Sequence, residues 1–593
     1  MAIRDTVGGT FASVIHTASN RYQEGGITSL IKQKELLVIV VSAVLTLLVI
    51  FPFYFILYGS FSLNGIGEEF VFTLQNYYAI ATGAGIPGMP NTIIATYNTI
   101  YVSIISTVMG IVGGLLMAWI VMRTNTPGVQ RFRGLIIFPY FISTFLAGFA
   151  WQGIAGEHIG LLNGILTRLG FEPVFAIATP FGIAFVMGIH YIPLAFLLIA
   201  SSLSNMDASL EEVARICGAS RLKVLRKIVV PMMAPAVLGA TILIFVLAFS
   251  HFGVPAALGL KQGYYVLSTA VYWAVVRDPP AYGPATATAM LLAVFTAGLV
   301  AFRLVWLKGK EYTTVRGKAV RPKKTDLGRW KWLSAGFVAL YIFLAVILPL
   351  FYFGVLTLYK FLVPFPTLEI LTLQNWERVL GFGFTWTAIK NSLFLGFIAA
   401  AVAILLGLAV SWVVVRTEVR GRQFLDVLAT VPIAVPAIVV GIAYLWAALS
   451  FPGGFYGSIL VIAVALVARY FPYAVRVLDN NIRQISVEME EVAHTAGADW
   501  QTTFRKIVIP LLRPGIAASF VLLYASFVRS ITIPALLYTG ESTVTSTLML
   551  SLWFDGNLSQ VAVIGVIQLF MIVIGIVIFM KVFKINLDDV TAR

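Results

Sequence analysis

Two polar stretches of this chain repeat each other. Leu210-Glu-Glu-Val-Ala-Arg-Ile-Cys-Gly-Ala-Ser220 leads to Ile228-Val-Val-Pro231, and Met489-Glu-Glu-Val-Ala-His-Thr-Ala-Gly-Ala-Asp499 leads to Ile507-Val-Ile-Pro510. The numbers of matching residues differ by a constant 279, as 490 − 211 and 510 − 231 show. A constant offset over a whole segment indicates internal duplication, so the chain consists of two related halves in tandem.

The duplication extends well beyond these stretches. His190-Tyr191 with Pro193 matches Arg469-Tyr470 with Pro472 at the same offset. Upstream the offset drifts because loop lengths differ: it is 293 (391 − 98) for Asn98 and Asn391, for Arg123 and Arg416, and for Pro139 and Pro432, and 299 (375 − 76) for Leu74-Gln75-Asn76 and Leu373-Gln374-Asn375. Both copies run in the same chain order.

Composition sets the class of protein. Apolar residues make up 59% of the chain and charged residues only 11%, and the mean hydropathy is +0.92, whereas a soluble domain carries about 25% charged residues. Apolar runs of roughly 20 residues, enough to cross a bilayer, lie near 36–58, 97–122, 135–154, 178–200, 234–254 and 285–307, and near 333–357, 391–415, 427–449, 457–478, 513–534 and 561–582. The sequence predicts an all-α polytopic membrane protein with about twelve transmembrane helices, in two parallel-repeat halves of six.

Basic residues predict the orientation and the domain boundaries. The net charge of +15 is concentrated in alternate loops, as in Arg123, Arg131 and Arg133, and this pattern is typical of the positive-inside rule rather than of nucleic-acid binding. We expect a cytoplasmic N-terminal tail at 1–35, a first half at 36–307 with its polar loop at 202–233, a basic cytoplasmic linker at 308–331, a second half at 332–584 with its loop at 479–512, and a C-terminal tail at 585–593. Both termini and both polar loops are then cytoplasmic in a multi-pass bacterial inner-membrane protein.

Several kinds of chemistry find no support in the sequence. Cys217 is the only cysteine, so we expect neither an internal disulfide nor a metal cluster. No Gly-x4-Gly-Lys-Ser/Thr phosphate loop is present, so this chain does not hold ATP by that motif. Paired acids and nucleophile constellations are missing too, so we expect no catalytic residues and no cofactor bound by this chain.

Each polar loop is predicted to form a short helix across the membrane surface. Glu211 and Glu212 stand near the positive N-terminal end of this helix, and Gly218 can end it. Pro231 and Pro235 are tolerated at the first turn of the next span. Gly497 and Pro510 repeat the pattern. A mere connector between helices would not need small residues, a glycine and two prolines at one spacing twice over.

The pattern Glu-x-Ala-x3-Gly-x9-Ile-x2-Pro resembles the EAA loop of ATP-binding-cassette (ABC) importer permeases. It is present as Glu212, Ala214, Gly218, Ile228 and Pro231 and as Glu491, Ala493, Gly497, Ile507 and Pro510, with Glu211 and Glu490 directly before it. The resemblance implies that each loop is a coupling helix seated on one of two copies of a cytoplasmic ATPase subunit, which would hold ATP and Mg²⁺. Val213 and Val492 replace the usual first Ala, a mild departure that leaves the docking role in place.

The fused architecture resembles permeases of the ferric-iron, 2-aminoethylphosphonate, polyamine and thiamine importer branch. Phe252-Gly-Val-Pro-Ala-Ala-Leu-Gly259 and Ile533-Pro-Ala-Leu-Leu-Tyr538 are similar to ferric and phosphonate members in particular. The resemblance implies a type I importer permease that accepts a solute from a periplasmic binding protein. The expected solute is ferric iron, alone or with an anionic ligand, or an organophosphonate.

Ionisable residues inside the spans are the candidates for the translocation path, because burying a charge in hydrocarbon costs several kcal/mol. His190 and Arg469 stand mid-span at matching positions, and Ser250-His251 matches Arg529-Ser530 at the outer ends of two spans. No Asp or Glu lies deep in a predicted span, so a path lined by these residues is electropositive and suits an anion. Hydrogen bonding between helices and snorkelling to the interface remain alternative roles for His190 and Arg529.

Two other functional classes stay open. A secondary active transporter can also have two six-helix halves with parallel repeats, and a channel would conduct without an ATPase. The duplicated docking loop favours the importer over both.

Overall fold

A computed structural model of the chain describes residues 38–82, 90–158, 160–205, 213–214, 216–307, 324–363, 368–450, 453 and 455–583. Across these ranges the structure is helical, with three isolated bridges in place of β-strands. Within the described residues ten helices are long and apolar enough to cross a membrane, and the total is twelve when each of two bent pairs is counted as one span. The predicted all-α polytopic fold is confirmed. The predicted tails, and residues 308–323 of the predicted linker, lie outside the described residues.

The first half contributes six spans. They are Val38–Phe61, which includes η1 (Thr46–Ile50) and α2 (Phe51–Phe61); α4 (Thr92–Arg123); the pair formed by α5 (Arg133–Ile137) with η2 (Phe138–Phe141) and α6 (Thr144–Ala155); α8 (Pro180–Asn205); α11 (Val230–Phe249); and α14 (Tyr282–Leu307). Between them lie α3 (Gln75–Thr82), α7 (Leu161–Arg168), α10 (Arg221–Val224), η3 (Leu225–Val229), α12 (Gly253–Gly259), η4 (Leu260–Gln262) and α13 (Leu267–Val276).

The second half repeats this order. Its spans are α15 (Trp330–Ile342) with η5 (Phe343–Ile347) and α16 (Leu348–Leu356); α18 (Gly383–Phe394) with η7 (Leu395–Ala399) and α19 (Ala400–Arg416); the pair α20 (Arg422–Ala434) and α21 (Ala437–Ser450); α22 (Ile459–Gln484); η8 (Phe504–Val508) with α25 (Ile509–Val528); and α28 (Leu558–Phe583). Between them lie η6 (Leu368–Ile370), α17 (Gln374–Gly381), α23 (Val487–Thr495), α24 (Trp500–Thr503), α26 (Pro534–Leu537) and α27 (Thr545–Phe554).

The third span of each half is sharply bent. α5 with η2 turns by 100° into α6, and α20 turns by 105° into α21. Ile142 is extended at the first bend, and Val435, which precedes Pro436, is extended at the second, as the residue before a proline tends to be. Both arms of each pair are apolar, so hydropathy alone counts each pair as one span.

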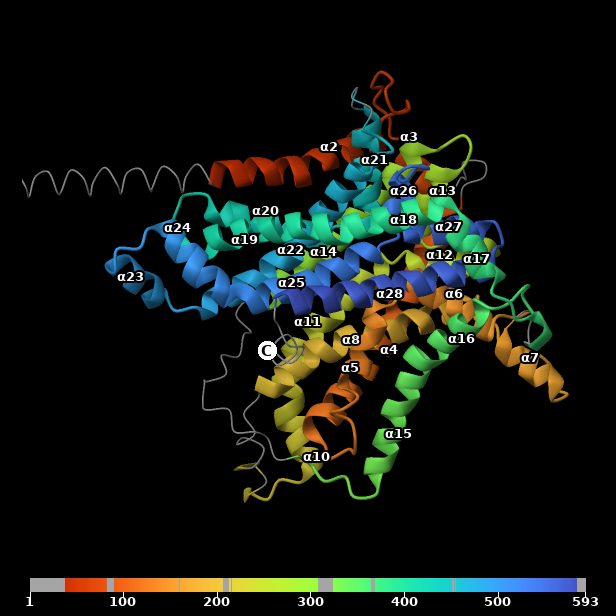
Figure 1. Cartoon of the computed structure of the whole chain (residues 1–593), viewed down its shortest axis with the longest axis horizontal. Coiled ribbons are helices and arrows are strands. Elements are labelled where there is room, and N and C mark those ends of the chain that lie inside the picture. The colour runs from red at the N-terminus through yellow and green to blue at the C-terminus, as the bar shows by residue number, and fades with distance from the viewer. Residues whose placement is uncertain are drawn as a thin grey trace, which may run out of the picture.

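The first span of each half also packs against the other half. The Tyr444 hydroxyl on α21 donates to the Leu48 carbonyl over 2.7 Å, and a Cβ added at Gly59 of α2 would lie 2.7 Å from the Trp446 ring. In the second half, α15 lies beside α5, green beside orange in Figure 1, and α16 packs on α6. The first span of each half also packs on the last span of its own half, α14 or α28, so it bridges the two halves.

Paired asparagines fix the outer connections in both halves. Asn76 Nδ2 donates to the carbonyls of Ser60 and Ser62, and Asn375 Nδ2 donates to those of Thr357 and Tyr359. The repeated Leu-Gln-Asn thus holds the chain where it returns after the first span. Asn98 and Asn391 on the second span bind the loop before α13 and α27, through the carbonyl of Tyr265 and those of Glu541 and Thr543, respectively.

Candidate functional site

The two polar loops have the same local geometry around their glycines. Gly218 and Gly497 have φ angles of +81° and +84°, a left-handed conformation that other residues adopt only at a cost. The Ala219 amide donates to the Ala214 carbonyl over 3.0 Å, and the Ala498 amide donates to the Ala493 carbonyl over the same distance. These bonds close the helix end in the Schellman manner. The predicted short helix and its glycine stop are therefore both present in the second loop, as α23.

Each loop then enters the fifth span through a π-turn. Ile228 lies in η3 and Ile507 in η8, and Pro231 and Pro510 stand in the first turn of α11 and α25. Proline has no amide hydrogen to offer the preceding turn, and a π-turn shifts the hydrogen-bond register there. The repeated Ile-x2-Pro spacing therefore marks the same structural joint in both halves.

Helix α23 of the second loop presents different residues to the protein and to the outside. Ala493 is buried at 7% exposure, whereas Glu491 is exposed and Val492 is 69% exposed. In the first loop Ala214 packs against the core and Val213 is exposed. Glu211 and Glu212 lie outside the described residues. The loops thus leave a partly apolar outer face free for a partner.

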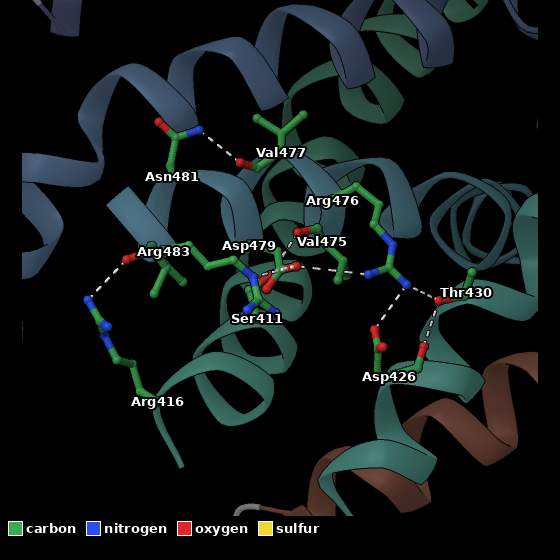
Figure 2. A network of polar contacts seen from close by, with 11 residues as sticks. Ser411, Arg416, Asp426, Thr430, Val475, Arg476, Val477, Asp479, Asn481 and Arg483 are labelled. Carbon is green, nitrogen blue, oxygen red and sulfur yellow. Dashed lines mark hydrogen bonds and ion pairs between the residues drawn. The ribbon is translucent and has the colours of Figure 1, made fainter. Parts of the chain in front are cut away.

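Glu490, by contrast, points inward to Arg416 at the end of α19, with 3.0 Å between Oε1 and Nε. Arg416 Nη2 also donates to the carbonyls of Ile482 and Ile485 at the end of α22. Figure 2 shows Arg416 at the edge of a polar network on α22, in which Arg476 reaches Asp426 and Thr430 of α20. The network ties three spans together at the end of the molecule that carries the coupling helix.

A cavity of about 230 Å³ lies between the two halves. Its lining comes largely from matching positions of the repeat, such as Thr144 and Ala437, Leu243 and Leu522, and Leu247 and Ser526. All six residues predicted for the translocation path line it: His190, Ser250 and His251 from the first half, and Arg469, Arg529 and Ser530 from the second. The sequence predicted these six residues as polar or ionisable positions in separate apolar spans. The structure places all six around one cavity.

Two matching serines hold the turns that carry these residues. Ser268 Oγ donates to the His251 carbonyl and Ser546 Oγ donates to the Ser530 carbonyl, each over 2.5 Å. Ser268 is the second residue of α13 and Ser546 is the second residue of α27. Asn98 and Asn391 bind the loops that precede these two helices. Asn98 and Asn391 on the second span of each half thus hold the loops next to the cavity and do not line it.

The cavity is positively charged on the side of the second half. Arg469 is 5% exposed, and its Nε and Nη1 have no hydrogen-bond partner among the described residues. Its Cζ lies 5.3 Å from the Tyr470 ring centre and 5.9 Å from that of Tyr473. Arg529 Cζ lies 4.2 Å over the ring of Tyr140, which belongs to the first half. Both guanidiniums therefore rest on aromatic faces, a favourable cation–π arrangement.

The first half contributes neutral polar groups instead. His251 Nδ1 and the Tyr191 hydroxyl lie 2.9 Å apart, and the buried His251 Nε2 has no partner in the described part of the chain. Neither Asp nor Glu occurs among the described residues that line the cavity. Its lining thus combines two guanidiniums, imidazoles, hydroxyls and aromatic faces.

Comparison with known proteins agrees with the duplicated architecture. The sequence matches the family of binding-protein-dependent transport system inner membrane components twice, over residues 110–307 and 402–588. The chain belongs to this family. It is therefore the fused, two-repeat permease of an ABC importer, which decides against the secondary transporter and the channel.

Similar proteins include ferric transport permeases. Over 437 residues this permease is 25% identical to a putative ferric transport system permease of Haemophilus influenzae, covering 73% of this chain and 67% of the relative. It is also 25% identical to a ferric transport system permease of Actinobacillus pleuropneumoniae over 81% of this chain and 69% of that one. A solved bacterial ABC transporter that imports alginate aligns with 43% of this chain and 96% of its own, at 16% identity and a TM-score of 0.33.

Sequence reasoning missed the tyrosines of the permease cavity. Tyr140, Tyr191, Tyr470 and Tyr473 all line it, but the chain has 23 tyrosines, and a tyrosine in a span ordinarily packs or lies at the interface. The one available signal was the pair Tyr191 and Tyr470, which stand next to His190 and Arg469 in the repeat.

Proposed function

We propose that this permease carries ferric iron across the bacterial inner membrane, accepting it from a periplasmic binding protein. The observation that supports this substrate is the similarity to two ferric transport permeases over most of the chain. An organophosphonate is the second candidate, because the cavity is positively charged. Its partners would be two copies of a cytoplasmic ATPase subunit, the binding protein and membrane lipid, without nucleic acid.

The coupling loops are the proposed seats of the ATPase subunits. The first would be built on Glu211, Glu212, Ala214, Gly218, Ile228 and Pro231, and the second on Glu490, Glu491, Ala493, Gly497, Ile507 and Pro510. In the second loop Glu491 would face the subunit, while Glu490 and Ala493 hold the loop against this chain. The exposed Val492 and Ile216, at 69% and 84% exposure, offer apolar surface for burial against a partner. ATP and Mg²⁺ would be held by those subunits and not by this chain.

This assignment implies an orientation and a mechanism. Both termini and both coupling loops would lie in the cytoplasm. When ATP draws the two ATPase subunits together, each loop would move with its subunit, and the fifth spans α11 and α25 would follow because η3 and η8 join them directly to the loops. Since these spans carry His251 and Arg529 at their far ends, movement at the loops would alter the cavity.

The test is reconstitution of the whole importer in proteoliposomes with its ATPase and its binding protein. We expect ATP-dependent uptake of ferric iron that requires the loaded binding protein, and no uptake of 2-aminoethylphosphonate. Uptake of the phosphonate and not of iron would show that the proposed substrate is wrong but that the protein is an importer. If neither solute moves and no ATPase subunit binds the chain, the proposed partners are wrong.

A further inference from the structure

Among the described residues that line the cavity, no Asp or Glu balances the charge of Arg469 and Arg529. The acidic residue that follows Arg469 on α22 is Asp479, ten residues further on, or about 15 Å along the helix. Asp479 is itself engaged by Arg483 and Arg476, and Asp426 by Arg476. Asp479 and Asp426 therefore already pair with arginines near the end of α22 that lies beside α23 and do not pair with Arg469.

Helix dipoles offset only part of this charge. Arg529 is the C-cap of α25 and Ser250 is the C-cap of α11, and each helix C-terminus carries about half a negative charge. Arg529 thus meets the negative end of its own helix. Arg469 stands in the interior of α22, at neither end of that helix, and has no such compensation.

A buried guanidinium without a counter-ion is costly, and water can satisfy its N–H groups but not its charge. The aromatic rings of Tyr470 and Tyr473 contribute cation–π attraction, which in proteins is much weaker than a full ion pair. Two atoms of the Arg469 fork, Nε and Nη1, are left to donate. The Nε hydrogen points to the side of Nη2, away from Nη1, so the two donors serve separate oxygen atoms. Negatively charged oxygens of a carboxylate, phosphate or phosphonate are strong acceptors for such donors.

We propose that the cavity is an oxyanion-binding site in which Arg469 and Arg529 hold the negatively charged oxygens of the transported species. Resting on the proposed iron-import function, this means that ferric iron crosses as a complex with an anionic oxygen ligand and not as the bare ion. His251 Nε2 and the hydroxyls of Ser530 and Tyr473 supply further polar contacts. At about 230 Å³ the cavity is smaller than sites for drug-sized ligands, about 300–1,000 Å³, and suits a small complex.

Direct binding tests the site. The full chain in lipid nanodiscs is titrated calorimetrically with inorganic phosphate and, separately, with ferric citrate. We expect Arg469→Gln to weaken binding of both at least about tenfold, as the loss of a charge-assisted contact predicts, and Arg469→Lys to weaken it less. The matched control is Arg483→Gln, an arginine on the same helix α22 that is 59% exposed and outside the cavity. Equal binding by wild type and Arg469→Gln, or no binding of either anion by the wild type, overturns the proposal.

Folding and transport are checked separately. Arg529→Gln, on another helix, carries the test if both Arg469 variants fail to elute as a single species in gel filtration. In proteoliposomes with the ATPase and the binding protein, we expect Arg469→Gln to lose most iron uptake. Normal uptake by that variant would show that the proposed anion site is wrong, without contradicting the importer function. If the wild type moves no iron in any form, the iron substrate is wrong, and phosphate binding in nanodiscs still decides the site.

Discussion

Glu490 and Arg416 form an ion pair that joins the coupling helix α23 to the transmembrane span α19, and both side chains are largely shielded, at 14% and 10% exposure. The same guanidinium binds two carbonyls at the end of α22. One arginine therefore connects α23, the proposed seat of an ATPase subunit, to two spans. The adjacent acids differ in role: Glu490 is turned into the protein, and Glu491 faces outward.

This relationship predicts different defects for the two acids. Glu490→Gln should leave ATPase binding intact but reduce iron uptake per ATP hydrolysed several-fold, because a shielded charge pair worth about 1.5–3 kcal/mol is lost. Glu491→Gln should instead weaken ATPase binding. Uptake and hydrolysis measured side by side in proteoliposomes separate the outcomes. Identical behaviour of the two variants would show that the ion pair has no transmitting role.

Gly497 should tolerate asparagine better than valine. Its φ is +84° and nothing lies within 4 Å of an added Cβ, so the constraint is backbone conformation, which costs a β-branched residue about 1–2 kcal/mol or more and asparagine less. We expect ATPase binding in a pull-down to follow the order Gly, Asn, Val, with Gly497→Pro uncoupling transport while the chain still inserts. If Gly497→Val bound as well as wild type, the left-handed helix stop would be dispensable.

Cys217 provides a natural probe of orientation. It is the only cysteine in the chain and is exposed next to Gly218. A membrane-impermeant maleimide should label it in inverted vesicles and leave it unlabelled in intact spheroplasts, and a bound ATPase subunit should slow the labelling. The control is Cys217→Ser, which should not label at all. Labelling in intact spheroplasts would place the loop on the opposite side of the membrane.

Asn375 should matter more for stability than its neighbour. Its side chain is 4% exposed and satisfies the carbonyls of Thr357 and Tyr359. Asn375→Ala removes the donor to both carbonyls. We expect it to lower the stability of the fold by about 1–3 kcal/mol for each buried carbonyl left unsatisfied. The unfolding temperature of Asn375→Ala, measured by gel filtration after heating, should be lower than that of the wild type. The unfolding temperature of Gln374→Ala, at an exposed position, should be unchanged. Equal melting of both variants would argue against the bridging role.

The repeat made much of this fold predictable. Apolar length located the twelve spans because the bilayer requires about 20 apolar residues whatever their neighbours. The coupling helices were predictable because glycine and proline impose their conformations locally, so Gly497 and Pro510 alone mark the stop of α23 and the start of α25.

Features that depend on the packing of distant segments were not predictable. The pairing of Tyr444 with Leu48 joins residues 396 positions apart, and nothing in either local sequence specifies that contact. The same holds for Tyr140, which meets Arg529 only because α25 and the bent third span converge on the cavity. The histidines and arginines of the path stood out because burying a charge is costly, and Ser250 and Ser530 because they match Arg529 and His251 in the repeat. The tyrosines carry no charge.

The contact of each first span with the other half sets a condition on how the protein is made. The span Val38–Phe61 leaves the ribosome early, but α21, which contacts it through Tyr444 and Trp446, is complete only at Ser450. That delay is about 390 residues, or roughly 20–80 s at about 5–20 residues per second. During this interval the first span can pack on α14 of its own half but has no partner from the second half. Fusing the halves into one polypeptide keeps the late partner tethered nearby, so that this contact forms within one molecule and not between two.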